Sequence, residues 1–262
     1  MASFLQEITP LILTYNEAPN IRRSLAKLDW AGDIVVVDSH SDDSTRDICR
    51  GFPHVRVFER TFDTHAAQWN FALGETGIAT DWVLALDADY VLSDAIISEL
   101  GRIDPGEPVS GYSAAFRYCV GGRPLRGTLY PPVTVLYRRK RAHYVQDGHT
   151  QRIVVRGEVL ALRGKIFHDD RKPLTSWLRA QDRYMRLESA HLHQTRWKKL
   201  RAPDRLRKLV VVSPVAVLLY CLFVKGCIVD GRAGLYYALQ RMLAECLLSL
   251  RILELTIVGK PE

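Results

Sequence analysis

Several signals that would classify the chain at once are absent. Its five cysteines form no Cys-x-x-Cys pair and are odd in number, which fits a reduced, cytosolic compartment. The start, MASFLQEITP, has no basic region followed by a long apolar stretch, so we expect no secretory signal. No internal repeat or low-complexity segment interrupts the sequence.

Two glycine-rich phosphate-binding signatures are also missing. No G-x-G-x-x-G follows the first apolar run, and no G-x-x-x-x-G-K-[ST] occurs anywhere. The sequence therefore disfavours a dinucleotide-binding protein and a P-loop protein.

The composition is that of a folded protein with an anionic partner. The chain has 262 residues, of which 47% are hydrophobic, and a net charge of +7. This charge suits a phosphorylated small molecule, a nucleic acid or an anionic membrane. Much of the basic charge lies beside an apolar segment and no nucleic-acid motif is visible, so we expect no nucleic-acid partner.

Short apolar runs alternate with helical patterns in the N-terminal half. The expected strands are 8–15, 33–38, 55–60 and 81–90, and the expected helices are 16–28, 44–52 and 65–76. Ser44 or Thr45 is placed as the N-cap of the second helix. The alternation predicts an α/β fold with a mostly parallel sheet, flanked by helices and joined by right-handed crossovers.

Polar residues follow the predicted strands. They are Thr14, Asn16 and Glu17 after the first strand, Asp38, Ser41 and Asp43 after the second, and Asp87 and Asp89 after the fourth. Ligands of such sheets bind beyond the carboxyl ends of the strands. We therefore expect these groups to face one crevice.

Asp87 and Asp89 are the candidates for a metal site. Side chains two apart on an extended segment point the same way. Mg²⁺ and Mn²⁺ prefer one or two carboxylates together with substrate phosphates and water, and such a metal would neutralise charge on a departing diphosphate. The alternative is that the strand simply reaches the surface and enters a turn.

Four stretches in this order, LILTYNEAPNI, IVVVDSHSDDST, QWNFAL and WVLALDADYVLS, resemble the donor half of family 2 glycosyltransferases with the GT-A fold. The resemblance continues through 111–142 and reaches 222–239. It is closer to the type that extends lipopolysaccharide core or related bacterial envelope glycans.

The resemblance implies a role for each matching residue. Thr14 and Glu17 would line the nucleotide pocket, and Asp38 would contact the base. Asp43 would stabilise the nearby loop, while Gln68 and Asn70 would lie beside the ribose or diphosphate. Asp87 and Asp89 would form the Asp-x-Asp metal motif, with Asp89 preferred as the direct ligand. Asp43 also fits an ordinary turn, and Gln68 a solvated helix face.

The general base is expected in HYVQDGHTQRIVV, residues 143–155. Inverting transfer needs a group that takes the proton of the acceptor hydroxyl. Related sequences often carry a His-Glu pair where this chain has Thr150 and Gln151, and glutamine is no base. Asp147 or His149 could take over, and we prefer Asp147 because His149 could instead bind diphosphate or metal, or be structural.

A second group of candidates follows at 168–171. They are His168, Asp169 and Arg171. Arg or Lys in this stretch could approach the diphosphate and stabilise the transferred charge, or the stretch could be a surface loop before a helix that starts near Thr175.

The C-terminal third predicts membrane association. Residues 195–208 are basic and contain Trp197, and the uncharged run 209–224 is shorter than the roughly 20 residues that span a bilayer. Pro214 interrupts this run, and 232–255 suits an interfacial or partner-packing helix. A buried core helix and a hairpin through the bilayer are the alternatives.

The predicted organisation has three parts. Residues 1–165 form a GT-A catalytic domain with a donor half, 1–100, and an acceptor side, 101–165. A helical linker with a basic flank, 166–208, precedes membrane-associating helices at 209–262.

The predicted protein is an inverting glycosyltransferase using Mg²⁺ or Mn²⁺. It would move a sugar from a nucleotide-sugar donor to a lipid-linked envelope glycan, as a peripheral or monotopic protein bound to the anionic cytoplasmic face of the inner (plasma) membrane. Polyprenyl phosphate is the alternative acceptor, and a membrane-tethered nucleotide-binding scaffold without activity is the alternative function.

Overall fold

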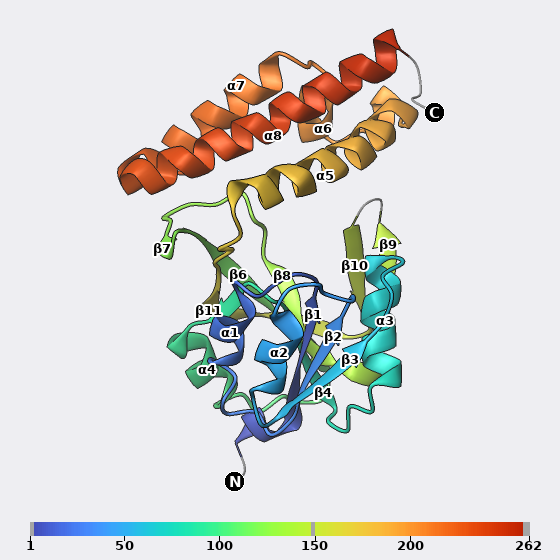
Figure 1. The fold of residues 1–262 in the computed structure, drawn as a ribbon, viewed down its shortest axis with the longest axis vertical. Coiled ribbons are helices and arrows are strands. Elements are labelled where there is room, and N and C mark those ends of the chain that lie inside the picture. Colours follow the sequence, from blue (N-terminus) through green and yellow to red (C-terminus); the bar gives the residue numbers. More distant parts are fainter. Residues whose placement is uncertain (1–2, 148–149, 259–262) are drawn as a thin grey trace. The chain divides into compact units, whose positions relative to one another are not determined.

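The computed structural model describes residues 3–147 and 150–258 (Figure 1). The chain forms two compact units. Unit 1 consists of Met1–Cys119 and Tyr130–Arg171, and unit 2 consists of Val120–Leu129 and Lys172–Glu262.

A mixed sheet forms the centre of unit 1. Its strand order is β3-β2-β1-β4-β8-β6-β11-β5. The strands are β1 (Ile8–Thr14), β2 (Ile34–Asp38), β3 (Val55–Glu59), β4 (Trp82–Asp87), β5 (Tyr90–Leu92), β6 (Val109–Val120), β8 (Val133–Arg138) and β11 (Glu158–His168). The α/β class is therefore confirmed, with a sheet that is parallel only in part.

The four strands predicted from the N-terminal half pair in parallel with one another, and β6 and β11 form a further parallel pair. β1 pairs in parallel with β2 and β4, and β2 with β3. Thr14 is in register with Asp38, and Leu13 is in register with Asp87. The β1 and β2 residues are almost all buried, as expected for parallel strands covered on both faces.

The other part of the sheet contains the antiparallel pairs. β8 runs antiparallel to β4 and β6, and β5 runs antiparallel to β11. In the last pair, His168 is in register with Tyr90, the residue after Asp89.

Helices cover both faces of this sheet (Figure 1). They are α1 (Ile21–Leu25), α2 (Thr45–Arg50), α3 (His65–Glu75) and α4 (Asp94–Leu100). One apolar cluster contains Ile21, Ile96 and Leu84, and a second contains Trp69 and Val83. Since Val83 and Leu84 are neighbours on β4, the two clusters lie on opposite faces of the sheet.

A separate antiparallel hairpin packs against α3. It consists of β9 (Ala142–Asp147) and β10 (Thr150–Val155). The Tyr144 ring stacks on Trp69 with 5.2 Å between ring centroids, which attaches the hairpin to the helix.

Unit 2 is helical. Its elements are β7 (Arg123–Pro124), α5 (Leu174–Gln194), α6 (Ala202–Arg207), α7 (Val212–Leu219) and α8 (Gly231–Ile257). Helix α8 packs against α5 and α7. The chain turns between α7 and α8 at Gly226 and Gly231, which have φ of 71° and 60°, values that favour glycine.

No single helix within the described residues is both long and apolar enough to cross a membrane. The segments Val212–Val224 and Cys227–Ile257, bent by 72° at the break between them, satisfy that test of length and composition only as a pair.

Candidate active site

Asp38 lies at the centre of the loops that follow β1 and β2. Its side chain is 1% exposed. Thr14 Oγ1 and Ser41 Oγ donate to Asp38 Oδ2 at 2.8 and 2.6 Å, and the Ser41 amide donates to Oδ1 at 2.7 Å. Hydrogen bonds compensate the burial of this carboxylate, and Arg46 Nε lies 3.9 Å from Oδ1.

The loop after β1 is fastened to the loop after β2. Asn16 has φ of 53°, and its amide donates to Ser41 Oγ at 2.8 Å. The amide of Glu17 donates to Thr45 Oγ1 at 2.7 Å, and the amide of Ala18 donates to Asp43 Oδ2 at 3.1 Å. The two predicted strand ends therefore form one connected surface.

Asp43 also caps α2. Its Oδ1 accepts from the Thr45 amide at 2.9 Å. Ser44 occupies the N-cap position but makes no side-chain capping bond, so the predicted cap by Ser44 or Thr45 is replaced by the carboxylate that precedes them.

Asn20 connects this loop to the end of β11. Its buried Nδ2 donates to Glu17 Oε2 at 2.8 Å and to Asp170 Oδ1 at 2.9 Å. Its Oδ1 accepts from the Arg171 amide at 2.8 Å. Arg23 forms an ion pair with Asp169 beside it. Residues 169–171 are therefore hydrogen-bonded to the loop that carries Glu17. The alternative of a free surface loop does not describe them.

Gln68 lies near the end of β2. It is 1% exposed, and its Nε2 donates to Ser39 Oγ at 3.1 Å while Arg60 donates to its Oε1 at 2.5 Å. The alternative of a solvated helix face is therefore wrong for Gln68. Its contact with a ribose or diphosphate stays a prediction.

Asp87 and Asp89 lie where β4 gives way to β5. Asp89 Oδ2 lies 3.0 Å from Nε2 of His168, the last residue of β11. The Asp89 carbonyl also accepts from the Asp169 amide at 3.0 Å. Asp89, two residues after the end of β4, therefore has a partly buried imidazole opposite it.

Aromatic rings enclose His168. Tyr90, Tyr118 and Tyr130 meet it edge-on, with 4.9 to 5.2 Å between ring centroids. Burial lowers the pKa of His168, but the charge and hydrogen bond of Asp89 and the charge of Asp87 outweigh it, so the pKa is raised above its ordinary value. The buried Nδ1 has no hydrogen-bond partner among the described residues.

The two candidates for the general base belong to the β9–β10 hairpin. Asp147 ends β9, and its backbone pairs with Thr150 of β10. His149 lies outside the described residues, and the side chain of Asp147 is not described. The preceding Gln146 accepts from the Ala66 amide at 3.4 Å, so the end of β9 lies at the start of α3.

Asn70 holds the same hairpin at Tyr144, through both ends of its side-chain amide. This role in packing was not expected from the sequence. The contact between Asn70 and the donor stays a prediction.

No group of three or more His, Cys, Asp and Glu side chains in 3–147 and 150–258 is arranged so that it could hold a metal ion. Asp87 and Asp89 stay the predicted ligands of a divalent ion, because Mg²⁺ and Mn²⁺ usually take few protein ligands and complete their shell with phosphates and water. His168 was a candidate only as part of the stretch 168–171, and its pairing with Asp89 was not predicted.

The fold and the site together define the class of this protein. It is an α/β protein whose parallel strands bring carboxylate and hydroxyl groups to one edge of the sheet, as in proteins that bind ligands there. The model of the family described as Glycosyl transferase family 2 matches residues 11–159, more than half of the chain, and the chain belongs to this family.

Individual relatives are distant. An uncharacterized glycosyltransferase of Rickettsia bellii is 30% identical over 145 residues, which are 53% of this chain and 48% of that protein. The chain therefore spans about half the length of this curated relative.

Solved structures are similar only at low identity. The structure of S. aureus TarS 1–349 in complex with UDP-GlcNAc has a TM-score of 0.46 and 15% identity, over 97% of this chain and 92% of that one. Glucosyl-3-phosphoglycerate synthase from Mycobacterium tuberculosis, in complex with Mn²⁺, UDP and phosphoglyceric acid, has a TM-score of 0.43 and 14% identity, over 65% of this chain and 72% of that one.

Proposed function

We propose that this protein is a GT-A-type glycosyltransferase that moves a sugar from a nucleotide-sugar donor to an acceptor hydroxyl, with inversion at the anomeric carbon. The observation that carries the proposal is the pairing of Asp89 with His168 at 3.0 Å. This pair lies at the end of β4, while Asp38 ends β2, and both strands run parallel to β1 between them. Carboxylates from separate segments therefore reach one edge of the sheet.

A divalent cation, Mg²⁺ or Mn²⁺, would be held by Asp89 and His168, with Asp87 beside them. When bound, it would neutralise charge on the leaving diphosphate. Carboxylate oxygens and an imidazole nitrogen are ligands that suit Mn²⁺. The aromatic rings of Tyr90, Tyr118 and Tyr130 pack around the imidazole of His168, which supports a fixed direction of its Nε2.

The loops after β1 and β2 would hold the nucleotide. Asp38 is buried and hydrogen-bonded to Thr14 and Ser41, so it fixes the shape of both loops in addition to any contact with a base. Glu17 and Asp43 belong to the same connected surface.

The acceptor side would be formed by the β9–β10 hairpin. Asp147 or His149 would take the acceptor proton, with Asp147 preferred. A lipid-linked saccharide of the envelope, such as lipopolysaccharide core, is the proposed acceptor, and polyprenyl phosphate is the alternative. The cytoplasmic face of the inner membrane, as predicted from the sequence, is the proposed location.

One observation favours a nucleotide-binding scaffold without activity as the second candidate. Gln151 stands where related sequences often carry a basic Glu, and Gln151 pairs with Gln146 across the hairpin. Neither amide can accept a proton at neutral pH.

Donor binding is tested by calorimetry with a panel of nucleoside diphosphates and nucleotide sugars, with and without Mn²⁺. Asp89→Asn and His168→Gln should each weaken Mn²⁺-dependent binding at least about tenfold. Asp94→Asn is the matched control, because its side chain is 88% exposed on α4. Unchanged Mn²⁺-dependent binding in both site variants would overturn the metal assignment.

Turnover separates the enzyme from the scaffold. Asp147→Asn and His149→Ala are compared for hydrolysis and transfer of the donor, and the base is the residue whose loss lowers turnover while donor affinity stays the same. A wild-type protein that binds the donor but neither hydrolyses nor transfers it would support the scaffold.

A further inference from the structure

Helices α7 and α8 of unit 2 bury polar side chains while many of their large apolar side chains are exposed. Ser213, Glu245 and Ser249 are buried. Ser213 donates to Glu245 at 2.5 Å, Arg207 Nε donates to Glu245 at 3.2 Å, and Ser249 donates to the Val210 carbonyl at 2.6 Å. Polar groups are therefore part of the contacts that α8 makes with α6, α7 and the residues between them.

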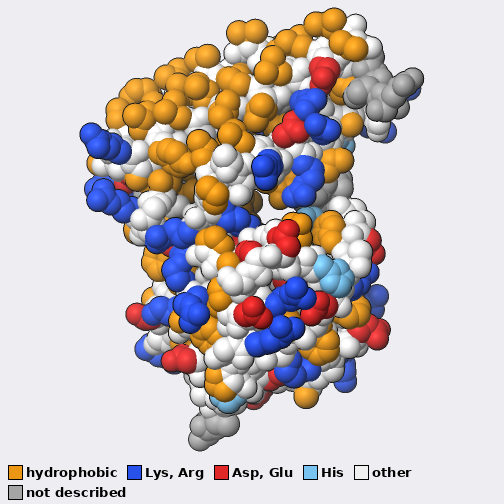
Figure 2. Space-filling model, viewed as in Figure 1, with side chains coloured by type: hydrophobic (Ala, Val, Ile, Leu, Met, Phe, Trp, Pro, Cys, Tyr) orange, Lys and Arg blue, Asp and Glu red, His pale blue; other side chains and the backbone are white. Residues whose placement is uncertain are grey.

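The large apolar side chains of the same elements point outward. Of the exposed large hydrophobic residues in the described chain, those from 209 onward are Leu209, Val211, Val212, Val215, Leu219, Tyr220, Phe223, Val224, Ile228, Val229, Leu235, Tyr236, Leu239, Leu243, Leu250, Leu253, Ile257 and Val258. We call this set the apolar face, and Figure 2 shows hydrophobic side chains over much of the visible surface formed by α7 and α8.

The apolar face is organised by helical spacing. On α8, Leu235, Leu239, Leu243, Leu250 and Leu253 follow one another at three, four or seven positions, which places them on one side of the helix. On α7 and its continuation, Val212, Val215, Leu219 and Phe223 do the same. Exposed apolar patches of this size mark protein or membrane contacts.

The charge of unit 2 argues for an anionic partner. Unit 2 has 18 Lys and Arg against 7 Asp and Glu, a formal net charge of +11. This leaves −4 for unit 1, since the whole chain carries +7. All of the net positive charge therefore belongs to the unit with the apolar face.

Basic side chains accompany an exposed tryptophan in the segment 196–201. Arg196, Lys198, Lys199 and Arg201 are exposed, and Trp197 is 49% exposed. Tryptophan at a membrane prefers the headgroup level, and Lys and Arg are attracted to anionic headgroups. A second copy of the same cationic unit would be repelled.

We propose that the apolar face of α7 and α8 inserts into one leaflet of an anionic lipid membrane, with the basic segment 196–201 at the headgroups. The proposal does not rest on sugar transfer.

The dimensions favour insertion over crossing. Val212–Val224 has 13 residues, about 20 Å of helix, against a hydrocarbon core of roughly 30 Å. Helix α8 is longer, but Arg241 and Glu245 interrupt it near its middle. Each element can cover a leaflet, and neither can cross the bilayer alone.

The test is flotation of the full chain with vesicles, without nucleotide or metal. We expect binding to phosphatidylcholine vesicles that contain phosphatidylglycerol, weak binding to phosphatidylcholine alone, and a decrease with salt. Val215→Asp and Phe223→Asp should each reduce partition at least about tenfold. Lys198→Gln and Lys199→Gln should each reduce it about fivefold, and only with the anionic lipid.

Phe62→Asp is the matched control. Phe62 belongs to unit 1 and is 46% exposed, against 63% for Phe223. Both substitutions therefore replace an exposed phenylalanine ring by a carboxylate and add one negative charge. Partition of Phe62→Asp should equal that of the wild type. Circular dichroism of each variant checks that the fold is kept, and the lipid and salt comparisons need no variant.

Three outcomes would overturn the proposal. The first is equal partition of the wild type with and without phosphatidylglycerol, or none at all. The second is a concentration-dependent dimer in buffer that Phe223→Asp abolishes while vesicle binding is absent, which would assign the face to a second copy. The third is resistance of the bound chain to alkaline extraction, which would indicate a crossing hairpin. Because no donor is present, none of these outcomes bears on sugar transfer.

Discussion

Asn70 and Tyr144 are joined by a reciprocal pair of hydrogen bonds. Asn70 Nδ2 donates to the Tyr144 carbonyl at 2.8 Å, and Asn70 Oδ1 accepts from the Tyr144 amide at 2.9 Å. The Asn70 side chain thus bonds both backbone groups of Tyr144, as a residue of a paired strand would do. Tyr144 belongs to β9, the strand that ends at Asp147.

Asn70→Ala should loosen the hairpin and leave the donor loops intact. We expect turnover of donor and acceptor to fall while donor affinity is unchanged, and stability to fall by about 1 kcal/mol. Glu75→Ala, at an exposed position of the same helix, is the control. A loss of donor affinity as large as the loss of turnover would instead support the predicted contact of Asn70 with the ribose or diphosphate.

Ser41→Ala should destabilise unit 1. Ser41 gives Asp38 one of its two hydroxyl donors and accepts from the Asn16 amide. Its loss leaves a buried carboxylate short of a donor, which costs about 1–3 kcal/mol. Urea unfolding measures the change. Ser98→Ala, an exposed serine on α4, should cost less than about 0.5 kcal/mol, and equal effects of the two substitutions would contradict the role of Ser41.

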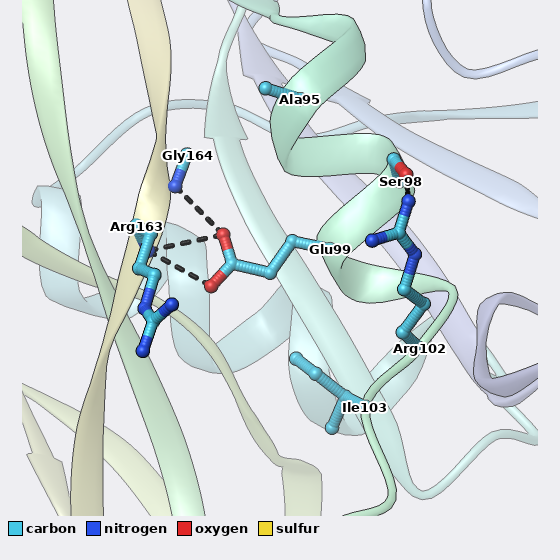
Figure 3. Close-up of a pocket in the computed structure, with 7 residues that line it drawn as sticks. All are labelled: Ala95, Ser98, Glu99, Arg102, Ile103, Arg163 and Gly164. Atoms are coloured by element: carbon cyan, nitrogen blue, oxygen red, sulfur yellow. Dashed lines mark hydrogen bonds between the residues drawn. The ribbon is translucent and has the colours of Figure 1, made fainter.

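Gly164→Ala and Gly74→Ala should change stability in opposite directions. A Cβ at Gly164 would lie 2.6 Å from Ile96 Cα, and the Gly164 amide donates to Glu99 at 2.7 Å (Figure 3). A Cβ at Gly74 in α3 would meet nothing within 4 Å. We expect a loss of about 1–3 kcal/mol for Gly164→Ala and a gain of up to about 1 kcal/mol for Gly74→Ala, read from thermal and urea unfolding.

The buried thiols should make the folded protein sensitive to alkali. Burial, and then the charge of Asp38, raise the pKa of Cys49 from 9.0 to about 12. An unfolded thiol therefore ionises at lower pH than the folded one, so stability is full below pH 9 and is lost as the pH rises from 9 towards 12. Unfolding at increasing pH should show this loss, and Cys49→Ser should reduce it.

Thiol labelling checks the same point at constant pH. At pH 8 the thiolate fraction of a thiol with a pKa of about 12 is on the order of 10⁻⁴, so Cys49 should react with Ellman's reagent only after denaturant is added. Rapid labelling of Cys49 in the native protein would contradict its burial.

The parallel part of the sheet was predictable because its signals are local. Short apolar runs with polar ends mark β1, β2 and β4, and the structure places Thr14, Asp38 and Asp87 at the same edge. Helix α1 begins at Ile21, later than the predicted start at 16, because Asn16 adopts a positive φ and the Glu17 and Ala18 amides donate to side chains of the next loop.

The pairing of Asp89 with His168 was not predictable from local pattern. It depends on the antiparallel pairing of β5 with β11, two short or irregular segments far apart in the chain. The part played by Asn70 has the same origin, because nothing near Asn70 in sequence indicates that β9 will pass beside it.

The polar contact between α7 and α8 bears on how the chain acquires its fold. Collapse in water buries apolar side chains. For these helices it would turn the exposed leucine and valine side chains of the apolar face inward and leave Glu245 without Arg207. A lipid or detergent phase removes that competition, since it takes up the leucine and valine side chains and leaves the polar groups to find one another. Renaturation from urea should therefore give more native protein with mild detergent than in plain buffer.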